Sequence, residues 1–191
     1  SGYNVAERKL GTSIALYMHE GNPGHHFQSM FAIENEALPE FMRYGGFTAF
    51  SEGWGLYAES LGYELGLYDD PVDRLAALQG GELLRAVRLV VDTGMHALGW
   101  SRDQAIEYMV ANGQPRDFAE SETARYIVMP AQALAYKTGE LKIKELRAKA
   151  QAALGQNFDV RRFHEQVLNT GDMPLPVLES KIDAWIAGGG Q

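Results

Sequence analysis

Apolar residues recur every three to four positions along almost the whole chain, which is the spacing of one face of a helix. Near the start, Leu10, Ile14 and Met18 form such a stripe between polar positions. This pattern predicts an amphipathic helix over residues 5–20. It predicts further helices over residues 23–37, 48–67, 71–98, 102–112, 117–128, 130–154, 158–168 and 175–187. No stretch alternates like a strand, so we expect an all-α fold, with residues 1–191 forming one mostly helical domain.

Short polar and glycine signals divide this pattern into helices. Asn22 followed by Pro23 is a favourable N-cap and first-turn pair, so the second helix is expected to begin there. Ser101 is the expected N-cap of the helix that follows it. Gly80 and Gly81 stand together inside the long helix predicted over 71–98, where they are expected to weaken it.

Charge and composition argue against several classes of protein. The chain has 25 acidic and 17 basic residues, and its formal net charge is −8. Nucleic-acid-binding proteins usually carry a basic face, so that class is disfavoured. The chain has no cysteine, which excludes a cysteine nucleophile and a cysteine-ligated zinc site. No run of about eighteen apolar residues occurs, so we expect no membrane segment. The compartment stays open between the cytoplasm and the periplasm or secretion.

Residues 18–28, MHEGNPGHHFQ, hold three of the five histidines of the chain. They resemble the zinc motif H-E-x-x-H, but the residue one turn after His19 is Pro23. On an unbroken helix, His25 would point about 240° away from His19, and His26 would lie about 10.5 Å along the axis. A Gly-Asn-Pro-Gly insert lets the chain leave the helix and return. We expect His25 to bind a metal with His19, and His26 is the alternative.

A carboxylate further along the chain would complete such a site. Residues 51–59, SEGWGLYAE, place small residues after Glu52, which would let its helix approach the two histidines closely. Zinc favours imidazole nitrogen and carboxylate oxygen, so zinc is the expected metal and Glu52 the expected third ligand. Glu59, two turns later, is expected to support the site from outside or to be solvated. The other interpretation is a polar helix turn that binds no metal.

Five segments together resemble the bacterial family called domain of unknown function 885. These are HEGNPGHHFQ, SEGWGLYAE, DTGMHALGWSRDQA at 92–105, PAQALAYKTGELKI at 130–143 and GDMPLPVLE at 171–179. The resemblance extends over essentially the whole chain and implies the C-terminal, motif-bearing part of a longer protein. That family is similar to the helical gluzincin metallopeptidases, such as carboxypeptidase Taq, thimet oligopeptidase and angiotensin-converting enzyme. The resemblance implies a helical gluzincin-like catalytic region.

The resemblance also assigns roles to residues of this chain. It implies that His19, His25 and Glu52 hold zinc and that Glu20 acts on the attacking water. Late tyrosines serve the oxyanion in gluzincins, which makes Tyr136 the candidate here. The expected substrate-binding residues are Arg125 or Lys137 as a carboxylate clamp, with Tyr126 and His96. Tyr126 and Tyr136 could equally be core residues, and Arg88, Asp92 and His96 could form a surface ladder of charges.

Two functions from different classes follow. The first is a zinc-dependent hydrolase of short peptides, acting as a carboxypeptidase or dipeptidase. The alternative is a non-catalytic helical module that kept the metallopeptidase scaffold and binds peptides or stabilises a larger protein. The N-terminal remainder of the same protein is an expected partner in either case.

Overall fold

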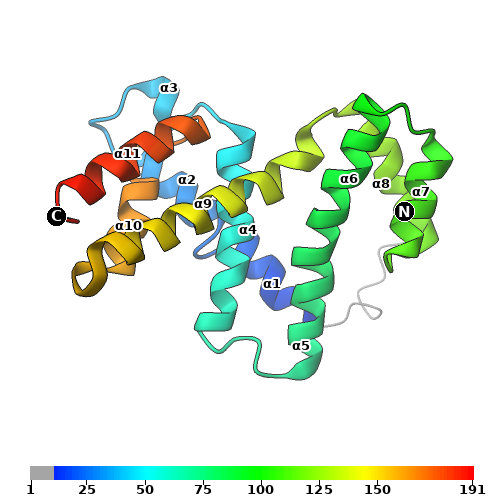
Figure 1. Ribbon diagram of the computed structural model, residues 1–191, viewed down its shortest axis with the longest axis horizontal. Helices are drawn as coiled ribbons and strands as arrows, with labels where there is room; N and C mark the ends of the chain where they lie inside the picture. The colour runs from blue at the N-terminus through cyan, green and yellow to red at the C-terminus, as the bar shows by residue number, and fades with distance from the viewer. Residues whose placement is uncertain (1–10) are drawn as a thin grey trace.

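The computed structural model describes residues 11–191, and this part of the chain is all-α, as predicted, with no strand. Figure 1 shows the helices and their labels. Their bounds are α1 Gly11–Glu20, α2 His25–Ile33, α3 Glu40–Arg43, α4 Thr48–Glu64, α5 Pro71–Ala76, the π-helix η2 Ala77–Leu83, α6 Leu84–Ala97, α7 Arg102–Ala111, α8 Arg116–Val128, α9 Gln132–Leu154, the 3₁₀ turn η3 Gly155–Asn157, α10 Val160–Leu168 and α11 Leu175–Ala187.

Helix α9 runs across the middle of the molecule and packs closely against α4, which it crosses (Figure 1). The crossing is made by glycines on both helices. A Cβ atom on Gly53 would lie 2.4 Å from the Cα atom of Gly139, and one on Gly139 would lie 1.9 Å from the carbonyl oxygen of Ala49. Only glycine allows this approach, so the sequence fixes where α4 and α9 touch. None of the helices described between residues 11 and 191 is long and apolar enough to cross a membrane.

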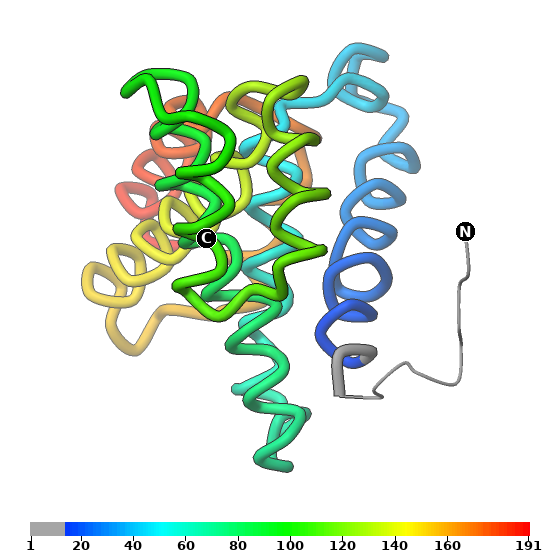
Figure 2. The backbone as a smooth tube through the Cα atoms, turned by 90° about the vertical axis from the view of Figure 1, so that its right-hand side faces the viewer, coloured from blue at the N-terminus to red at the C-terminus, as the bar shows by residue number. Residues whose placement is uncertain are grey.

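The two largest hydrophobic clusters lie along α9. The larger one joins its second half to α4, α10 and α11, with Phe50, Trp54 and Phe163 among its buried residues. The other joins α6, α7 and α8 near the start of α9, around Val91 and Met109. Figure 1 shows α10 and α11 at one end of α9 and α6 to α8 at the other. Figure 2 shows α1, α2 and α3 following one another along one side of the molecule.

Local signals placed several boundaries correctly. Ser101 caps α7 through a capping box with Gln104, and the expected weak point at Gly80 and Gly81 lies in the π-helix η2. The second helix was predicted too long, because α2 begins at His25 with Gly24 as its N-cap and ends at Ile33. The helix predicted over 5–20 corresponds to α1 from Gly11, and its first part lies outside the described residues.

Candidate metal centre

The turn between α1 and α2 brings the two histidines together. It is anchored on α4, because the indole nitrogen of Trp54 donates to the carbonyl oxygen of Pro23 at 2.8 Å. It is also tight, since a Cβ atom on Gly24 would lie 1.8 Å from the carbonyl oxygen of His19. Helix α1 therefore ends at Glu20, and α2 begins after the turn at His25. The imidazole rings of His19 and His25 lie edge to face, with centroids 4.6 Å apart.

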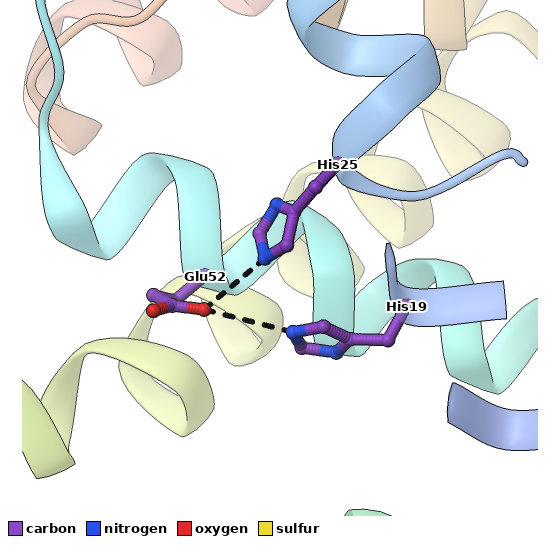
Figure 3. Close-up of side chains that lie close together, drawn as sticks. All are labelled: His19, His25 and Glu52. Carbon is purple, nitrogen blue, oxygen red and sulfur yellow. Dashed lines mark hydrogen bonds and ion pairs between the residues drawn. The ribbon is translucent and has the colours of Figure 1, made fainter. Parts of the chain in front are cut away.

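Glu52 of α4 completes a group of three possible ligands (Figure 3). Its Oε2 atom lies 3.2 Å from Nε2 of His25 and 3.6 Å from Nε2 of His19. One ligand atom from each residue lies within 4.8 Å of the others. The structure thus brings His25 into this group, whereas His26, the alternative from spacing, is exposed and lies outside it.

The remaining imidazole nitrogens are held by other side chains. Nδ1 of His19 forms a 2.7 Å hydrogen bond with Oε1 of Glu59, which is itself buried. Nδ1 of His25 forms a 3.3 Å hydrogen bond with Oε1 of Gln28. Because Glu59 and Gln28 present oxygen acceptors, each Nδ1 donates to its partner, and each Nε2 points toward Glu52, where it would coordinate a metal after losing its proton. Metal-binding histidines are usually oriented in this way.

Gly55 of α4 makes room for both rings. A Cβ atom at this position would lie 2.8 Å from Cε1 of His19 and 3.0 Å from Cε1 of His25. These distances are shorter than carbon atoms tolerate, so the histidines can approach α4 only over a glycine. The expected close approach of the Glu52 helix is confirmed at this residue.

Glu52 and the two histidines shift the pKa values of one another. Burial lowers the pKa of His19, but its hydrogen bonds to Glu52 and Glu59 outweigh burial and raise the pKa to about 9. The hydrogen bond to Glu52 also raises the pKa of His25. Burial raises the pKa of Glu52, yet the hydrogen bonds from both histidines hold it well below its usual range. The cluster therefore favours positive charge beside an ionised carboxylate.

Tyr136 of α9 lies next to His19 within a network of polar side chains. The two rings are stacked with centroids 6.0 Å apart. Nε2 of Gln132, one turn earlier, donates to Oε1 of Glu52 at 3.1 Å and to the Tyr136 hydroxyl oxygen at 3.2 Å. The guanidinium of Arg88 donates to Oε1 of Gln132 at 2.8 Å and lies 4.3 Å from the Tyr136 ring centroid. Tyr136 thus borders the candidate metal site.

Glu20, the predicted base, is the last residue of α1 and is exposed. Among residues 11–191 it is not one of the three possible ligands, and no hydrogen bond or ion pair holds its carboxylate. It follows His19 directly, which is a rotation of about 100° around α1.

The two predicted carboxylate clamps, Lys137 and Arg125, are engaged elsewhere. The ammonium of Lys137 pairs with Glu140 at 2.6 Å and with Glu82. Lys137 follows the site-facing tyrosine by one residue, which is a rotation of about 100° around α9 and turns it toward η2. Arg125 is exposed and pairs with Glu122 at 3.6 Å. In the described part of the chain, neither side chain bonds to the cluster, contrary to expectation.

The other two predicted substrate-binding residues, His96 and Tyr126, contact one another. Nε2 of His96 donates to the backbone oxygen of Tyr126 at 2.9 Å, near the end of α8. The Tyr126 ring is buried in the cluster of α6, α7 and α8, with the Arg88 guanidinium 5.1 Å from its centroid. His96 thus satisfies a carbonyl group near a helix end, and Tyr126 is a core residue behind Arg88.

Arg85 borders the site but was missed from the sequence. Its guanidinium lies 5.3 Å from the Tyr136 ring centroid, and its Nη2 atom lies 3.6 Å from Oε1 of Glu59. A usable signal was present, because Arg85 and Arg88 are three residues apart and therefore share one face of α6. Two arginines of that face, and no lysine, lie against Tyr136 among the described residues.

Comparison with known proteins identifies a family and several similar solved structures. The profile of the family "Bacterial protein of unknown function (DUF885)" matches residues 1–182. No curated protein matches the chain. A "putative lipoprotein" from Colwellia psychrerythraea is similar, with a TM-score of 0.88 and 45% identity over 91% of this chain. A "putative lipoprotein of unknown function" from Shewanella oneidensis has a TM-score of 0.77 and 27% identity over 87%. The chain spans 30% of the length of each.

Proposed function

The chain belongs to the DUF885 family of bacterial proteins, and we propose that it is a metal-dependent peptide hydrolase with zinc as its metal. The observation that carries the proposal is the convergence of His19, His25 and Glu52 within 4.8 Å. Two imidazole nitrogens and one carboxylate oxygen form a typical catalytic zinc ligand set, which leaves a fourth position open. We also propose that the family is related to the helical gluzincin metallopeptidases, such as carboxypeptidase Taq and thimet oligopeptidase.

Two features support a metal site over a polar helix turn. Glu59 and Gln28 engage the Nδ1 atoms, which leaves both Nε2 atoms for a ligand at the same point. Gly55 removes the side chain that would otherwise fill the space beside both rings. A polar helix turn that binds no metal would require neither arrangement.

The proposed chemistry divides roles among three groups. Bound zinc would lower the pKa of a water molecule and polarise a peptide carbonyl. Glu20 would take the proton of the attacking water and deliver it to the leaving amine. The Tyr136 hydroxyl would donate to the developing oxyanion. Gln132 donates to the Tyr136 oxygen, and the Tyr136 hydroxyl hydrogen-bonds to Glu52, which keeps it beside the proposed metal.

The proposed substrate is a short peptide, cleaved in a carboxypeptidase or dipeptidase mode. Lys137 and Arg125 are already paired with carboxylates, so Arg85 and Arg88, beside Tyr136, replace them as the proposed cations for a substrate carboxylate. The solved relatives are longer than this chain, and we propose that the remainder of such a protein forms another wall of the cleft.

Metal content is the first test. We expect about one zinc per chain by elemental mass spectrometry after reconstitution and desalting. His19→Ala, His25→Ala and Glu52→Ala should each lose it, because each removes a ligand, whereas His26→Ala should keep it. A wild-type chain without bound zinc would contradict the proposal and favour the alternative, a non-catalytic helical module.

Activity is the second test. Glu20→Gln should retain zinc but hydrolyse peptides at least about 100-fold more slowly, since it removes the general base. Glu36→Gln, which changes an exposed glutamate between α2 and α3, is the matched control and should hydrolyse at the wild-type rate. Full activity in the Glu20 variant would exclude the proposed role of that carboxylate.

A further inference from the structure

A polar cavity of about 340 Å³ opens beside His25. It is enclosed by α2, α3, the start of α4 and the loop before α11. Its polar lining comes mainly from His25, Gln28, Ser51, Arg43 and Asp172. Because His25 belongs both to this lining and to the candidate metal centre, a molecule in the cavity would extend to the metal centre. The volume is at the lower end for small-molecule sites, so it suits a small ligand.

Gln28 lines this cavity and carries an unpaired hydrogen-bond donor. Its side chain is 5% exposed, and its Oε1 atom is held by Nδ1 of His25. Its Nε2 atom is buried and has no hydrogen-bond partner among the described residues. An unpaired buried donor is unfavourable, so this position favours a ligand that brings an acceptor such as a carbonyl oxygen.

Asp172 presents a fixed carboxylate in the same cavity. Its Oδ2 atom accepts hydrogen bonds from the backbone nitrogen of Phe47 at 3.3 Å and from the Ser51 hydroxyl. No ion pair to Asp172 occurs among residues 11–191. Arg43, the cation of the cavity, donates instead through Nε to the Ile33 carbonyl oxygen at 3.0 Å. The carboxylate is therefore held in place without a cation of its own.

We propose that this cavity binds the free amino end of a short peptide. Asp172 accepts hydrogen bonds from the terminal ammonium, and Gln28 donates to a backbone carbonyl oxygen. The orientation rests on the proposed function, because the peptide then passes His25 and presents its first peptide bonds to the metal centre. Of the two proposed modes, this favours a dipeptidase over a carboxypeptidase.

The test compares two peptides that differ only in the ammonium group. Metal-free chain would be titrated with Ala-Ala and with N-acetyl-Ala-Ala, with binding followed by NMR. We expect Ala-Ala to bind at least about tenfold more tightly, since a charge-assisted hydrogen bond contributes more than 1.4 kcal/mol. Asp172→Asn should abolish this preference. Asp103→Asn, at an exposed aspartate of α7, is the matched control and should keep it.

A second variant separates the two contacts. Gln28→Leu should weaken both peptides alike, because both carry the carbonyl, and should leave the preference for Ala-Ala intact. Equal binding of the two peptides, no binding of Ala-Ala, or a preference that survives Asp172→Asn would each overturn the inference. Zinc content would be measured separately. An Asp172-dependent preference in a chain that binds no zinc would support this cavity and reject the proposed hydrolase.

Discussion

Helix α4 contacts one buried and one half-buried histidine, and their surroundings differ. His19 lies over Gly55, with the carboxylates of Glu52 and Glu59 at its two nitrogens. His164 of α10 packs edge-on against Trp54, and its Nε2 accepts from the Tyr57 hydroxyl at 2.8 Å. The His19 ring lies between two negatively charged carboxylates, whereas the His164 ring lies among aromatic side chains.

The difference appears directly in their pKa values. Burial disfavours the charged form of both rings. For His19 the hydrogen bonds to two carboxylates outweigh burial and raise the pKa to about 9. For His164 burial, followed by the nearby charge of Arg147, lowers the pKa to about 4. Neighbouring charges, more than burial, therefore separate the histidine of the candidate metal centre from the packing histidine. The following predictions test this distinction.

Gly55→Ala should have the largest effect, because it acts on both histidines of the cluster. The added Cβ atom would lie 2.9 Å from Nε2 of His19 and 3.0 Å from Cε1 of His25, so both rings must move. We expect zinc affinity, measured by competition with a chelator, to fall by more than about 100-fold, beyond the range for a supporting residue.

The matched control for this variant is Gly80→Ala. A Cβ atom on Gly80 would meet nothing within 4 Å, so zinc affinity should remain at the wild-type value. An unchanged affinity in Gly55→Ala would mean that the two rings do not bind the metal over α4.

Glu59→Gln should come next, because it removes the charge behind His19 while keeping its shape. The amide can still accept from Nδ1, but it no longer supports a more basic imidazole. We expect zinc affinity to fall by about 10- to 100-fold, with a small change in thermal stability. Glu64→Gln, on the same helix but paired with Arg147 at the surface, provides the comparison and should not alter zinc binding.

Roles that depend on neighbouring residues could be predicted from the sequence, whereas roles that depend on contacts between distant residues could not. Ser101 acts within its own helix turn, so its role follows from local sequence. The choice between His25 and His26 depends on how Trp54 holds the turn, a contact made 31 residues away. The family resemblance made Lys137 a candidate carboxylate clamp at the site, but its direction depends on the rotation of α9. Spacing predicts which residues share a helix face, and packing decides which face borders the candidate metal centre.

The acid sensitivity of the fold should arise at His164, with the opposite sign from a carboxylate-paired histidine. Its pKa is about 4 in the folded chain and near 6.5 when unfolded, so the unfolded chain binds more protons between these values. The free energy of unfolding should therefore fall by on the order of 2 kcal/mol as the pH drops from about 6.5 toward 4. Tyr57, Arg147 and Glu64 are the polar groups around it.

Denaturant unfolding at several pH values would measure this effect, with His164→Gln as the variant. The variant should lose part of the pH dependence in this window and keep its zinc. An unchanged pH profile would show that His164 is not the group responsible.

Gln28→Leu should have the smallest effect on the metal, although Gln28 holds Nδ1 of His25 as Glu59 holds that of His19. The Gln28 contact is longer, at 3.3 Å against 2.7 Å, and its acceptor is uncharged. The His25 side chain is also 25% exposed against 4% for His19, so water can replace a lost partner. We expect a loss of zinc affinity of only a few-fold, measured by the same chelator competition. A loss as large as that of Glu59→Gln would mean that orientation of the ring, rather than the charge behind it, sets the strength of this site.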